Sequence, residues 1–489
     1  MYEKIFLIVI ITLYLFIVIT VGFLIGRKVK TASDYAIAGK SLPGWAAALS
    51  ERATGESCWA LLGLPGAAYA IGLTELWTAI GCTLGILISW IFIANKIQEQ
   101  AKIYEANTFM DLISKRYGKP GQIIQTIGSL IIAFFFFFYI GAQFIGGGKT
   151  MNQIFQIDII SSIIMISIFV LPYTIYGGFK SVVYTDVIQA IIMITTLIVT
   201  PIIGIYYIHN NTDVYATNIY EALKYSGPQY TSLTGLAKGF NAGIVIISGF
   251  SWLFGYLGGM PQLTTRFMAI KDKKQTKQAR NIGIIWTLTA YTGALIIGWL
   301  GLAIFGPNHF IDREAIMPAV IMKLFNPFIG TILLTGVFAA IISTANSLLI
   351  LASTEISEIL IKTKLNLLNS LSNLNISRII TTIISLSALI FALTTTEHLV
   401  YNIVKYVWAG IGDTFSVIML LTIFWKRYHA KAVMWTMIVG MTFTIIWIQT
   451  PYEKYISCLI LTFLVALLTA IITTFLIKNY SYKTQTKTL

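Results

Sequence analysis

Apolar residues occur along this chain in long stretches that are separated by short polar segments. Many stretches reach about 20 residues, enough for a helix to cross the roughly 30 Å hydrocarbon core of a bilayer. The pattern predicts an all-α membrane protein with about 13 transmembrane helices. The predicted spans cover residues 4–26, 42–70, 74–95, 121–148, 156–177, 182–208, 240–261, 281–305, 327–351, 379–394, 398–425, 432–450 and 455–477.

Composition indicates the same class of protein. Of the 489 residues, 56% are hydrophobic and 11% are charged, and the mean hydropathy is +0.78. A soluble protein of this length could not hide so much apolar surface, so lipid must be the solvent for most of it. Cys58, Cys82 and Cys458 lie in apolar runs, without a CxxC pair or a Cys/His cluster. We therefore expect no disulfide framework, no structural metal and no cofactor.

The net charge of +14 follows the predicted topology. Most of the 34 Lys and Arg residues fall in alternate loops, on the side that also holds the C-terminal tail. Since basic loops stay in the cytoplasm, we predict a multi-pass protein of the plasma membrane with its N-terminus outside and its C-terminus in the cytoplasm. The first span has no small-residue cleavage site after it and is expected to be retained. The basic excess thus indicates topology and not nucleic-acid binding.

The second predicted span carries charges that a lipid-facing helix would not have. Glu51, Arg52 and Glu56 lie near its middle, with Gly55 among them. Because buried charges and unpaired backbone groups are costly in hydrocarbon, this pattern is typical of a discontinuous helix that lines a cavity. The alternative is an internal ion pair of Arg52 with Glu56 at i, i+4, and the two interpretations are compatible.

The seventh span is interrupted in a similar way. Its helix is weakened by Gly249, Gly255, Gly258, Gly259 and Pro261. Trp252 and Tyr256 share one face at i, i+4, which suits either packing or binding. Two broken helices five spans apart predict an inverted-repeat transporter with its site near the middle of the membrane.

The ninth span presents oxygen atoms on one face. Ala340, Ser343 and Thr344 follow at i, i+3 and i+4. A carbonyl and two hydroxyls suit a hard monovalent cation, although Ser and Thr also help membrane helices to pack. The face is therefore a candidate ion site.

Carboxylates occur in two other spans. Asp186 and Gln189, one turn apart in span six, suit either an ion path or a cap at a helix start near the cytoplasmic surface. Asp413 lies deep in span eleven. A lone carboxylate at that depth needs a partner, a proton or an ion.

Several motifs resemble those of the sodium:solute symporter family. They are ALSERATGESCWALLGLPGAAYAIG, GGFKSVVYTDVIQA, PQLTTRFMAI and AAIISTANSLLILASTEI. The similarity extends from about residue 30 to about residue 450 and is greatest to the sodium/proline symporter branch. It implies a core of five plus five helices in inverted repeats, formed by spans two to six and seven to eleven.

On this basis we expect a single transmembrane transporter domain over residues 1–489. The first helix and a cytoplasmic loop would occupy 1–40, and the two repeats would occupy 41–208 and 240–425. Extra helices and a short cytoplasmic tail would fill 432–489. The loops between spans are too short to fold as separate domains.

The resemblance also implies positions for the bound ion. The family's sodium site would fall on the backbone of Ala53 and Glu56, the carbonyl of Ala340, and the hydroxyls of Ser343 and Thr344. Asp186 matches an aspartate on the family's inward sodium route.

Solute contacts are implied in the same way. In the proline branch they would fall on Trp59, Tyr139, Trp252, Tyr256 and Pro261. All five residue types are kept, which supports an amino-acid-like solute. The stretch before Pro261 is one residue longer than in the family, so the place of this proline is left open.

Other positions depart from the family pattern. The proline branch has an aspartate, important for sodium, where this chain has Gly55, and Glu51 and Arg52 replace small residues. We hypothesise that Glu56 and Asp413 share the work of the missing carboxylate, with Arg52 balancing the added charge. Coupling to a proton that one of these buried carboxylates carries is the alternative to sodium coupling.

These features favour a secondary transporter that imports a small solute with sodium by alternating access, with proline or a similar amino acid as the first candidate. Alternatives of the same fold are a proton-coupled symporter, or one for an organic acid, a betaine, a vitamin or a sugar. A solute sensor without transport and a channel belong to other classes. An enzyme is disfavoured because the four histidines are scattered and form no catalytic or metal cluster; they are His209, His309, His398 and His429.

Overall fold

The computed structural model describes residues 2–27, 29, 32–362 and 372–477. Within these ranges the chain forms helices and no β-strand. The predicted cytoplasmic tail, residues 478–489, lies outside the described residues.

Twenty-two α-helices are described, and the long ones lie over the predicted apolar segments. In the first half they are α1 (Tyr2–Gly26), α2 (Ala32–Ile37), α3 (Gly44–Cys58), α4 (Leu64–Ile71), α5 (Leu76–Ile88), α6 (Ala94–Ile103), α7 (Phe109–Lys115), α8 (Gly121–Phe155), α9 (Ile159–Asn210), α10 (Ile219–Ser226) and α11 (Pro228–Thr231). In the second half they are α12 (Phe240–Phe250), α13 (Trp252–Gly255), α14 (Pro261–Ala269), α15 (Lys273–Phe305), α16 (Ile316–Leu324), α17 (Pro327–Lys362), α18 (Asn373–Thr394), α19 (Val400–Val407), α20 (Thr414–Phe424), α21 (Ala430–Trp447) and α22 (Cys458–Leu476).

Ten helical segments in the described part of the chain are long and apolar enough to cross a membrane. One of them, Gly44–Ile103, contains two of the predicted spans, while Ile159–Val170 and Phe240–Gly255 are apolar but shorter. The multi-pass, all-helical architecture is therefore confirmed. The number of about 13 crossings stays a prediction.

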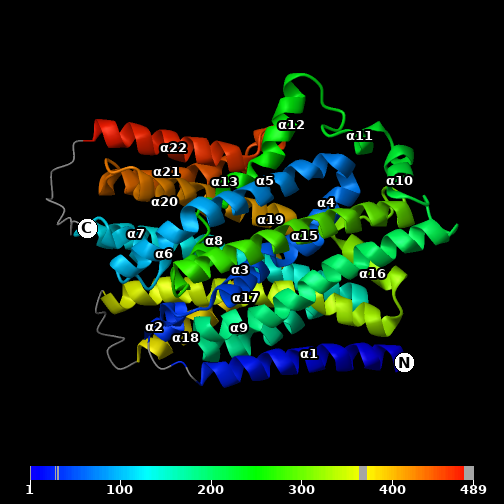
Figure 1. Cartoon of the computed structure of the whole chain (residues 1–489), viewed down its shortest axis with the longest axis horizontal. Coiled ribbons are helices and arrows are strands. Elements are labelled where there is room, and N and C mark those ends of the chain that lie inside the picture. Colours follow the sequence, from blue (N-terminus) through cyan, green and yellow to red (C-terminus); the bar gives the residue numbers. More distant parts are fainter. Residues whose placement is uncertain (1, 28, 30–31, 363–371, 478–489) are drawn as a thin grey trace.

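The long helices run side by side along the longest axis of the molecule (Figure 1). The first helix, α1, begins at one end of this bundle, and α22 finishes at the other end. The short helices α10, α11 and α16 gather at the end where α1 begins, whereas α6 and α7 lie at the opposite end. The loops are thus sorted into the two groups that the charge pattern separates. Which end faces the cytoplasm is still a prediction.

The boundary between predicted spans five and six falls inside α9. Gly178 there has φ 63° and ψ −176°, so two helices meet at this residue. Positive φ favours glycine, and a Cβ at Gly178 would also lie 2.6 Å from Cδ2 of Tyr35. The glycine is therefore required both by the turn and by the close approach of α2.

The helix α17 forms the centre of the bundle, packed against α3, α8, α9 and α18. Small residues let neighbouring backbones come close, as membrane helices require. A Cβ at Gly336 would lie 2.5 Å from Oγ1 of Thr196 on α9, and this hydroxyl donates to the Leu333 carbonyl at 2.9 Å.

Glu355, near the end of α17, links two other helices to α17 through hydrogen bonds. Its buried carboxylate accepts hydrogen bonds from the Thr108 hydroxyl, the Met110 amide and the Ser129 hydroxyl, each at 3.0 Å. The first amides of a helix have no partner within the helix, so a buried helix start needs such an acceptor. Glu355 supplies it for α7 and links α8 to the same point.

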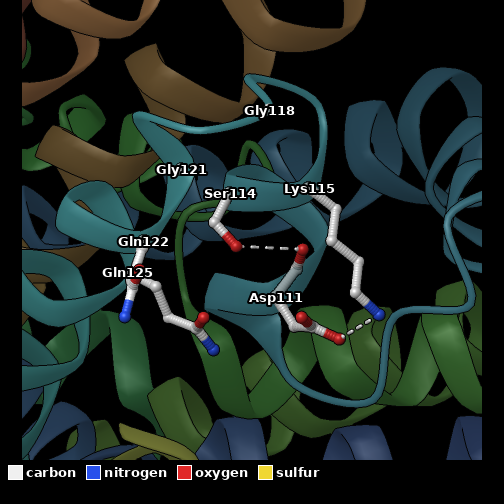
Figure 2. A pocket seen from close by; sticks show the side chains of 7 residues that line it. All are labelled: Asp111, Ser114, Lys115, Gly118, Gly121, Gln122 and Gln125. Carbon is white, nitrogen blue, oxygen red and sulfur yellow. Dashed lines mark hydrogen bonds and ion pairs between the residues drawn. The ribbon is translucent and has the colours of Figure 1, made fainter. Parts of the chain in front are cut away.

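A pocket opens next to this fastening, where α7 turns into α8 (Figure 2). It is lined by Asp111, Ser114, Lys115, Gly118, Gly121, Gln122 and Gln125. Lys115 closes one side by pairing with Asp111 at 2.8 Å. None of the predicted site residues lines this pocket.

Replacing Glu355→Ala should lower the free energy of unfolding by about 3 kcal/mol, because three buried donors lose their acceptor. The measurement is the thermal unfolding midpoint of the purified protein in detergent. Glu355→Gln is the control, since its amide oxygen still accepts and a smaller loss is expected. An unchanged midpoint for the alanine variant would contradict the fastening role.

Candidate functional site

The second predicted span is broken, as expected, and the structure locates the break. Ser57 has φ 49° and ψ −167°, a strained conformation for a residue with a side chain, and a π-helical turn over Trp59–Gly63 follows before α4. The Ser57 hydroxyl accepts from the Trp59 amide at 3.2 Å and from the Tyr139 hydroxyl at 3.3 Å. The interruption therefore lies two residues beyond Gly55 and is stabilised by side chains.

The seventh span is broken as well. Its helix stops after α13, passes through Gly258 with φ 87°, and starts again at Pro261 as α14. A third irregular segment, which the sequence did not reveal, is the π-helical turn Trp408–Asp413 between α19 and α20. These three segments lie next to one another, since Gly259 packs against Gly412 and Gly63 against Tyr401 at the start of α19.

Next to the break, hydroxyls of α17 meet carbonyls of α3. Ser343 donates to the carbonyls of Ala53 and Ala340, both at 3.0 Å. Thr344 donates to the Thr54 carbonyl at 3.0 Å. All of these residues are fully buried. The structure thus brings together four of the five predicted sodium ligands in an oxygen-rich group that suits a hard cation.

Glu56, the fifth predicted ligand, faces differently. Its carbonyl accepts from the Trp59 amide across the break, and its carboxylate pairs with Arg52 at 3.0 Å. The Thr54 carbonyl, which was not among the predicted ligands, lies against Thr344 instead. Thr54 directly follows Ala53, so its carbonyl was also a candidate. A backbone carbonyl has no side-chain signature, however, and the sequence did not single it out.

Arg52 is held by two carboxylates. It pairs with Glu51 and Glu56 and donates to the Thr287 hydroxyl at 3.1 Å. A Cβ at Gly55 would lie 3.4 Å from Nη2 of Arg52, so the guanidinium fills the space beside this glycine. The helix break and the internal ion pair therefore coexist.

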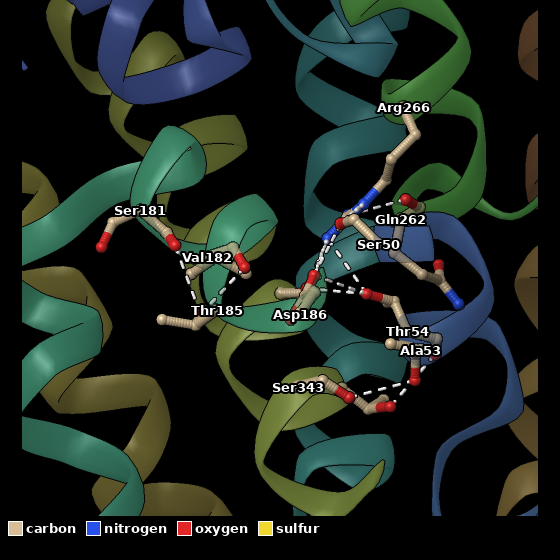
Figure 3. A network of polar contacts seen from close by, with 12 residues as sticks. Ser50, Ala53, Thr54, Ser181, Val182, Thr185, Asp186, Gln262, Arg266 and Ser343 are labelled. Carbon is tan, nitrogen blue, oxygen red and sulfur yellow. Dashed lines mark hydrogen bonds and ion pairs between the residues drawn. The ribbon is translucent and has the colours of Figure 1, made fainter. Parts of the chain in front are cut away.

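Asp186 is the centre of a second buried ion pair (Figure 3). Its Oδ2 accepts from the Ser50 hydroxyl at 2.6 Å and pairs with Nη2 of Arg266 at 3.1 Å. The same Nη2 donates to Thr54 at 3.0 Å and to Ser347 at 2.6 Å. This network joins α3, α9, α14 and α17, so Asp186 does not cap a helix start at the surface.

Arg266 falls between the predicted spans 240–261 and 281–305, where the sequence predicts a loop, and the structure places it inside the bundle instead. It is fully buried, the other residues of α14 are buried as well, and its guanidinium lies 4.9 Å from the centre of the Phe179 ring. Gln189 is not part of the network; it donates to the Tyr14 hydroxyl of α1 at 3.1 Å.

Four of the five predicted solute contacts form one aromatic cluster. Trp59 stacks on Trp252, with ring centres 4.8 Å apart and an angle of 13°. Tyr256 contacts Trp408 at 4.3 Å, and the indole of Trp408 donates to the Tyr139 hydroxyl at 3.5 Å. All five rings are buried.

Two further aromatic residues join this cluster, and Pro261 does not belong to its ring contacts. The Tyr291 and Tyr256 hydroxyls are 2.9 Å apart, and Tyr401 contacts Trp252 edge-on at 5.6 Å. Trp408, Tyr291 and Tyr401 were missed because they stand in helices without a motif. Pro261 is buried at the start of α14, where it opens the second half of the broken helix.

Asp413 differs from the other buried carboxylates of the site in its hydrogen bonding. It is fully buried, and neither of its side-chain oxygens has a hydrogen-bond partner among the described residues. Arg52, Glu51 and Glu56 bond among themselves, and Asp413 takes no part in that group. Among the described residues no hydrogen bond or ion pair joins Asp413 to Glu56, and the hypothesis that these two carboxylates share one role stays a prediction.

Comparisons with known proteins identify relatives of this chain. The model of the sodium:solute symporter family matches residues 35–440. The high-affinity proline transporter PutP of Bacillus subtilis (strain 168) is 31% identical over 452 residues, which cover 92% of this chain and 93% of that protein. The sodium/proline symporter of Salmonella typhimurium (strain LT2) is 31% identical over 444 residues, which cover 89% of this chain and 86% of that protein.

The fold is shared with a solved symporter. A Na+-coupled sialic acid symporter in a substrate-bound, outward-open state has a TM-score of 0.75 at 19% identity, and the match covers 97% of this chain and 98% of that one. This likeness confirms the predicted five-plus-five core with broken helices. Given the family match over most of its length and the relatives that are 31% identical over 444 and 452 aligned residues, the chain belongs to the sodium:solute symporter family.

Proposed function

We propose that this protein is a plasma-membrane symporter that uses sodium to import a small solute, proline or a similar amino acid, by alternating access. The observation that carries the proposal is the contact of the α17 hydroxyls with the α3 carbonyls at the helix break, beside a buried aromatic cluster. The names of the relatives, two of which are proline transporters, support the solute class.

Sodium would bind between the two helices. The carbonyls of Ala53 and Ala340 and the hydroxyls of Ser343 and Thr344 offer oxygens within hydrogen-bonding distance of one another. A cation there would take the lone pairs that now accept hydroxyl protons, and the hydroxyls would turn their oxygens inward. Binding would therefore tie α3 to α17 more firmly and organise the break.

The solute would bind on the other side of the break. An amino acid's carboxylate favours the amides that a discontinuous helix leaves without carbonyl partners. The Cys58 amide now donates to the Gln143 side chain at 3.3 Å, and the Trp59 amide to Ser57, partners that a carboxylate could replace. The apolar part of the solute would lie against the rings of Trp59 and Trp252.

Transport would then follow from a rocking of the two repeats, residues 41–208 and 240–425, around this point. The side with α6 and α7 would be cytoplasmic and the side with α10, α11 and α16 outside, as the distribution of Lys and Arg indicates. No enzymatic step is needed, since the sodium gradient supplies the free energy.

The Asp186–Arg266 pair suits a role in stabilising the cytoplasmic part of the transport path. Arg266 on α14 connects the second broken helix to the first through Ser50 and Thr54. A planar guanidinium can donate to several acceptors at once, which a lysine cannot. The pair would keep the two halves together on the predicted cytoplasmic side until the ion arrives.

The uptake of labelled L-proline into proteoliposomes tests the proposal. An inward sodium gradient should drive accumulation that excess unlabelled proline abolishes. A proton gradient alone should have no effect. Accumulation driven by protons without sodium would transfer coupling to a carboxylate such as Glu56, and no uptake under either gradient would reject proline.

Ser343→Ala and Thr344→Ala should each raise the sodium concentration for half-maximal uptake about tenfold or more, because each removes one oxygen from the proposed site. Maximal uptake at saturating sodium should fall less. Ser353→Ala is the matched control, because its buried hydroxyl, also on α17, bonds the Ile350 carbonyl of its own helix and no other group in the described part of the chain. If the control variant and the two site variants show the same dependence of uptake on sodium, the assignment of Ser343 and Thr344 to the sodium site is contradicted.

Asp186→Asn and Arg266→Gln should each lower stability by about 3–5 kcal/mol, because each leaves one buried charge without its partner. The double variant should be more stable than either single one, which thermal unfolding in detergent can show. Lys273→Gln, which breaks a pair with Glu99 at the surface, should change stability by less than about 1 kcal/mol. Additive losses in the double variant would show that the pair is not coupled.

A further inference from the structure

Among the described residues, Asp413 is a buried carboxylate that the proposed function leaves unexplained. Glu51 and Glu56 share Arg52, Asp186 has Arg266, and Glu355 has three donors. Asp413 is as deeply buried, and neither of its oxygens is bonded to a described residue. A carboxylate in this setting is unfavourable unless a counter-ion reaches it.

Asp413 is the last residue of the π-helical turn Trp408–Asp413. Such turns are frequent at functional sites, since they redirect side chains out of the regular helix pattern. This turn directs Asp413 toward α13: a Cβ at Gly255 would lie 3.5 Å from Oδ1 of Asp413 and 2.7 Å from the Trp408 ring. The carboxylate therefore lies at the edge of the aromatic cluster.

The cluster itself favours positive charge. The face of an aromatic ring carries partial negative charge and attracts ammonium groups, with tryptophan the strongest. Trp408 contacts both Tyr256 and Trp252, and Trp252 stacks on Trp59. A solute that separates these rings would enter a space with π faces around it and a carboxylate at its edge.

We propose that the solute of this transporter carries a cationic nitrogen and that Asp413 is its counter-ion. The inference rests on the proposed function and deepens it by naming the residue that binds the charged nitrogen of the solute. Amino-acid zwitterions and betaines meet this requirement, and sugars and nitrogen-free organic acids do not. The solute's ammonium would lie toward Asp413 and the π faces, while its carboxylate would lie toward the amides at the break in α3.

The division of charges explains why the solute should be zwitterionic. Arg52 is already shared by two carboxylates, so it does not offer an unmatched charge to an anionic solute. Asp413 offers an unmatched negative charge that a cationic nitrogen neutralises. Asp413 is thereby a solute-binding residue, separate from the sodium ligands on α3 and α17.

Two pairs of solutes that differ only in the charged nitrogen test the inference. One pair is L-proline and (S)-tetrahydrofuran-2-carboxylate, and the other is glycine betaine and 3,3-dimethylbutanoate. Binding of each to the purified full-length protein is measured by thermal shift and titration in sodium chloride and in potassium chloride. At least one nitrogen compound should bind in sodium, about 30-fold or more tighter than its nitrogen-free partner, as expected for a buried charge pair.

Asp413→Asn should remove this preference. The affinity for the nitrogen compound should fall about 30-fold or more, while the affinity for its partner should change little. Asp111→Asn, at the pocket beside α7, is the matched control for loss of a buried carboxylate and should keep the preference. The rise in unfolding temperature on sodium addition should be kept in both variants, which shows that they fold and bind the ion.

The outcomes separate this inference from the proposed function. A wild-type protein that sodium does not stabilise, and that shows no sodium-driven uptake, contradicts the proposed function. A sodium response combined with equal affinity within both pairs, or with sodium-dependent binding of a sugar or a nitrogen-free acid, overturns only the inference. The inference is also overturned if Asp413→Asn keeps the preference for the nitrogen compound but loses a dependence of uptake on a proton gradient. The carboxylate would then carry a proton and not bind the solute. If Asp413→Asn does not fold, the wild-type comparison still tests the inference, because equal affinity within both pairs of solutes would overturn it.

Discussion

A break in a helix within hydrocarbon leaves backbone groups that lipid cannot satisfy, and the rest of this structure is arranged around that problem. At Ser57 the chain leaves the helical conformation, and the groups on either side of the break find partners on other helices. The Ala53 and Thr54 carbonyls are met by hydroxyls of α17, and the Cys58 amide by Gln143 of α8. These partners are exchangeable, since an ion can replace a hydroxyl proton and a carboxylate can replace an amide oxygen. A structural necessity thus produces the two candidate binding positions.

Charge in the interior is distributed by a similar rule. Where the bundle buries a carboxylate it also supplies donors, either a guanidinium, as for Asp186, or helix amides and hydroxyls, as for Glu355. The arginines act through the fixed fork of their donors: Arg266 reaches residues on three other helices at once. Asp413 departs from this rule, because no described residue donates a hydrogen bond to either of its side-chain oxygens. A buried carboxylate without a donor does not stabilise the fold, so a role in function explains the presence of Asp413 better.

Local patterns gave most of the fold, and distant contacts determined most of the site. The spans and both broken helices could be predicted because hydrophobic length, glycine and proline are read from neighbouring residues. The aromatic cluster could be predicted only where a family motif or a broken helix marked a residue, as at Trp59 and Trp252. Trp408 and Tyr291 carry no such mark, and their place next to Tyr256 depends on how α15 and α19 pack. Arg266 falls between two predicted spans because its helix is too short and polar to resemble a span, although all residues of that helix are buried.

Gly55 stands where the proline branch has an aspartate, and this difference is best understood together with Arg52. A Cβ at position 55 would lie 3.0 Å from Leu263 and 3.4 Å from the Arg52 guanidinium, so a larger side chain there would compete with Arg52 for the same space. An aspartate, as the proline branch has, would bring a third carboxylate to an arginine that Glu51 and Glu56 already neutralise. The proposed sodium site therefore consists of neutral oxygens from α3 and α17, without a carboxylate. The affinity of such a site would depend on how closely these two helices approach, so the helix break itself would be the element that senses the ion.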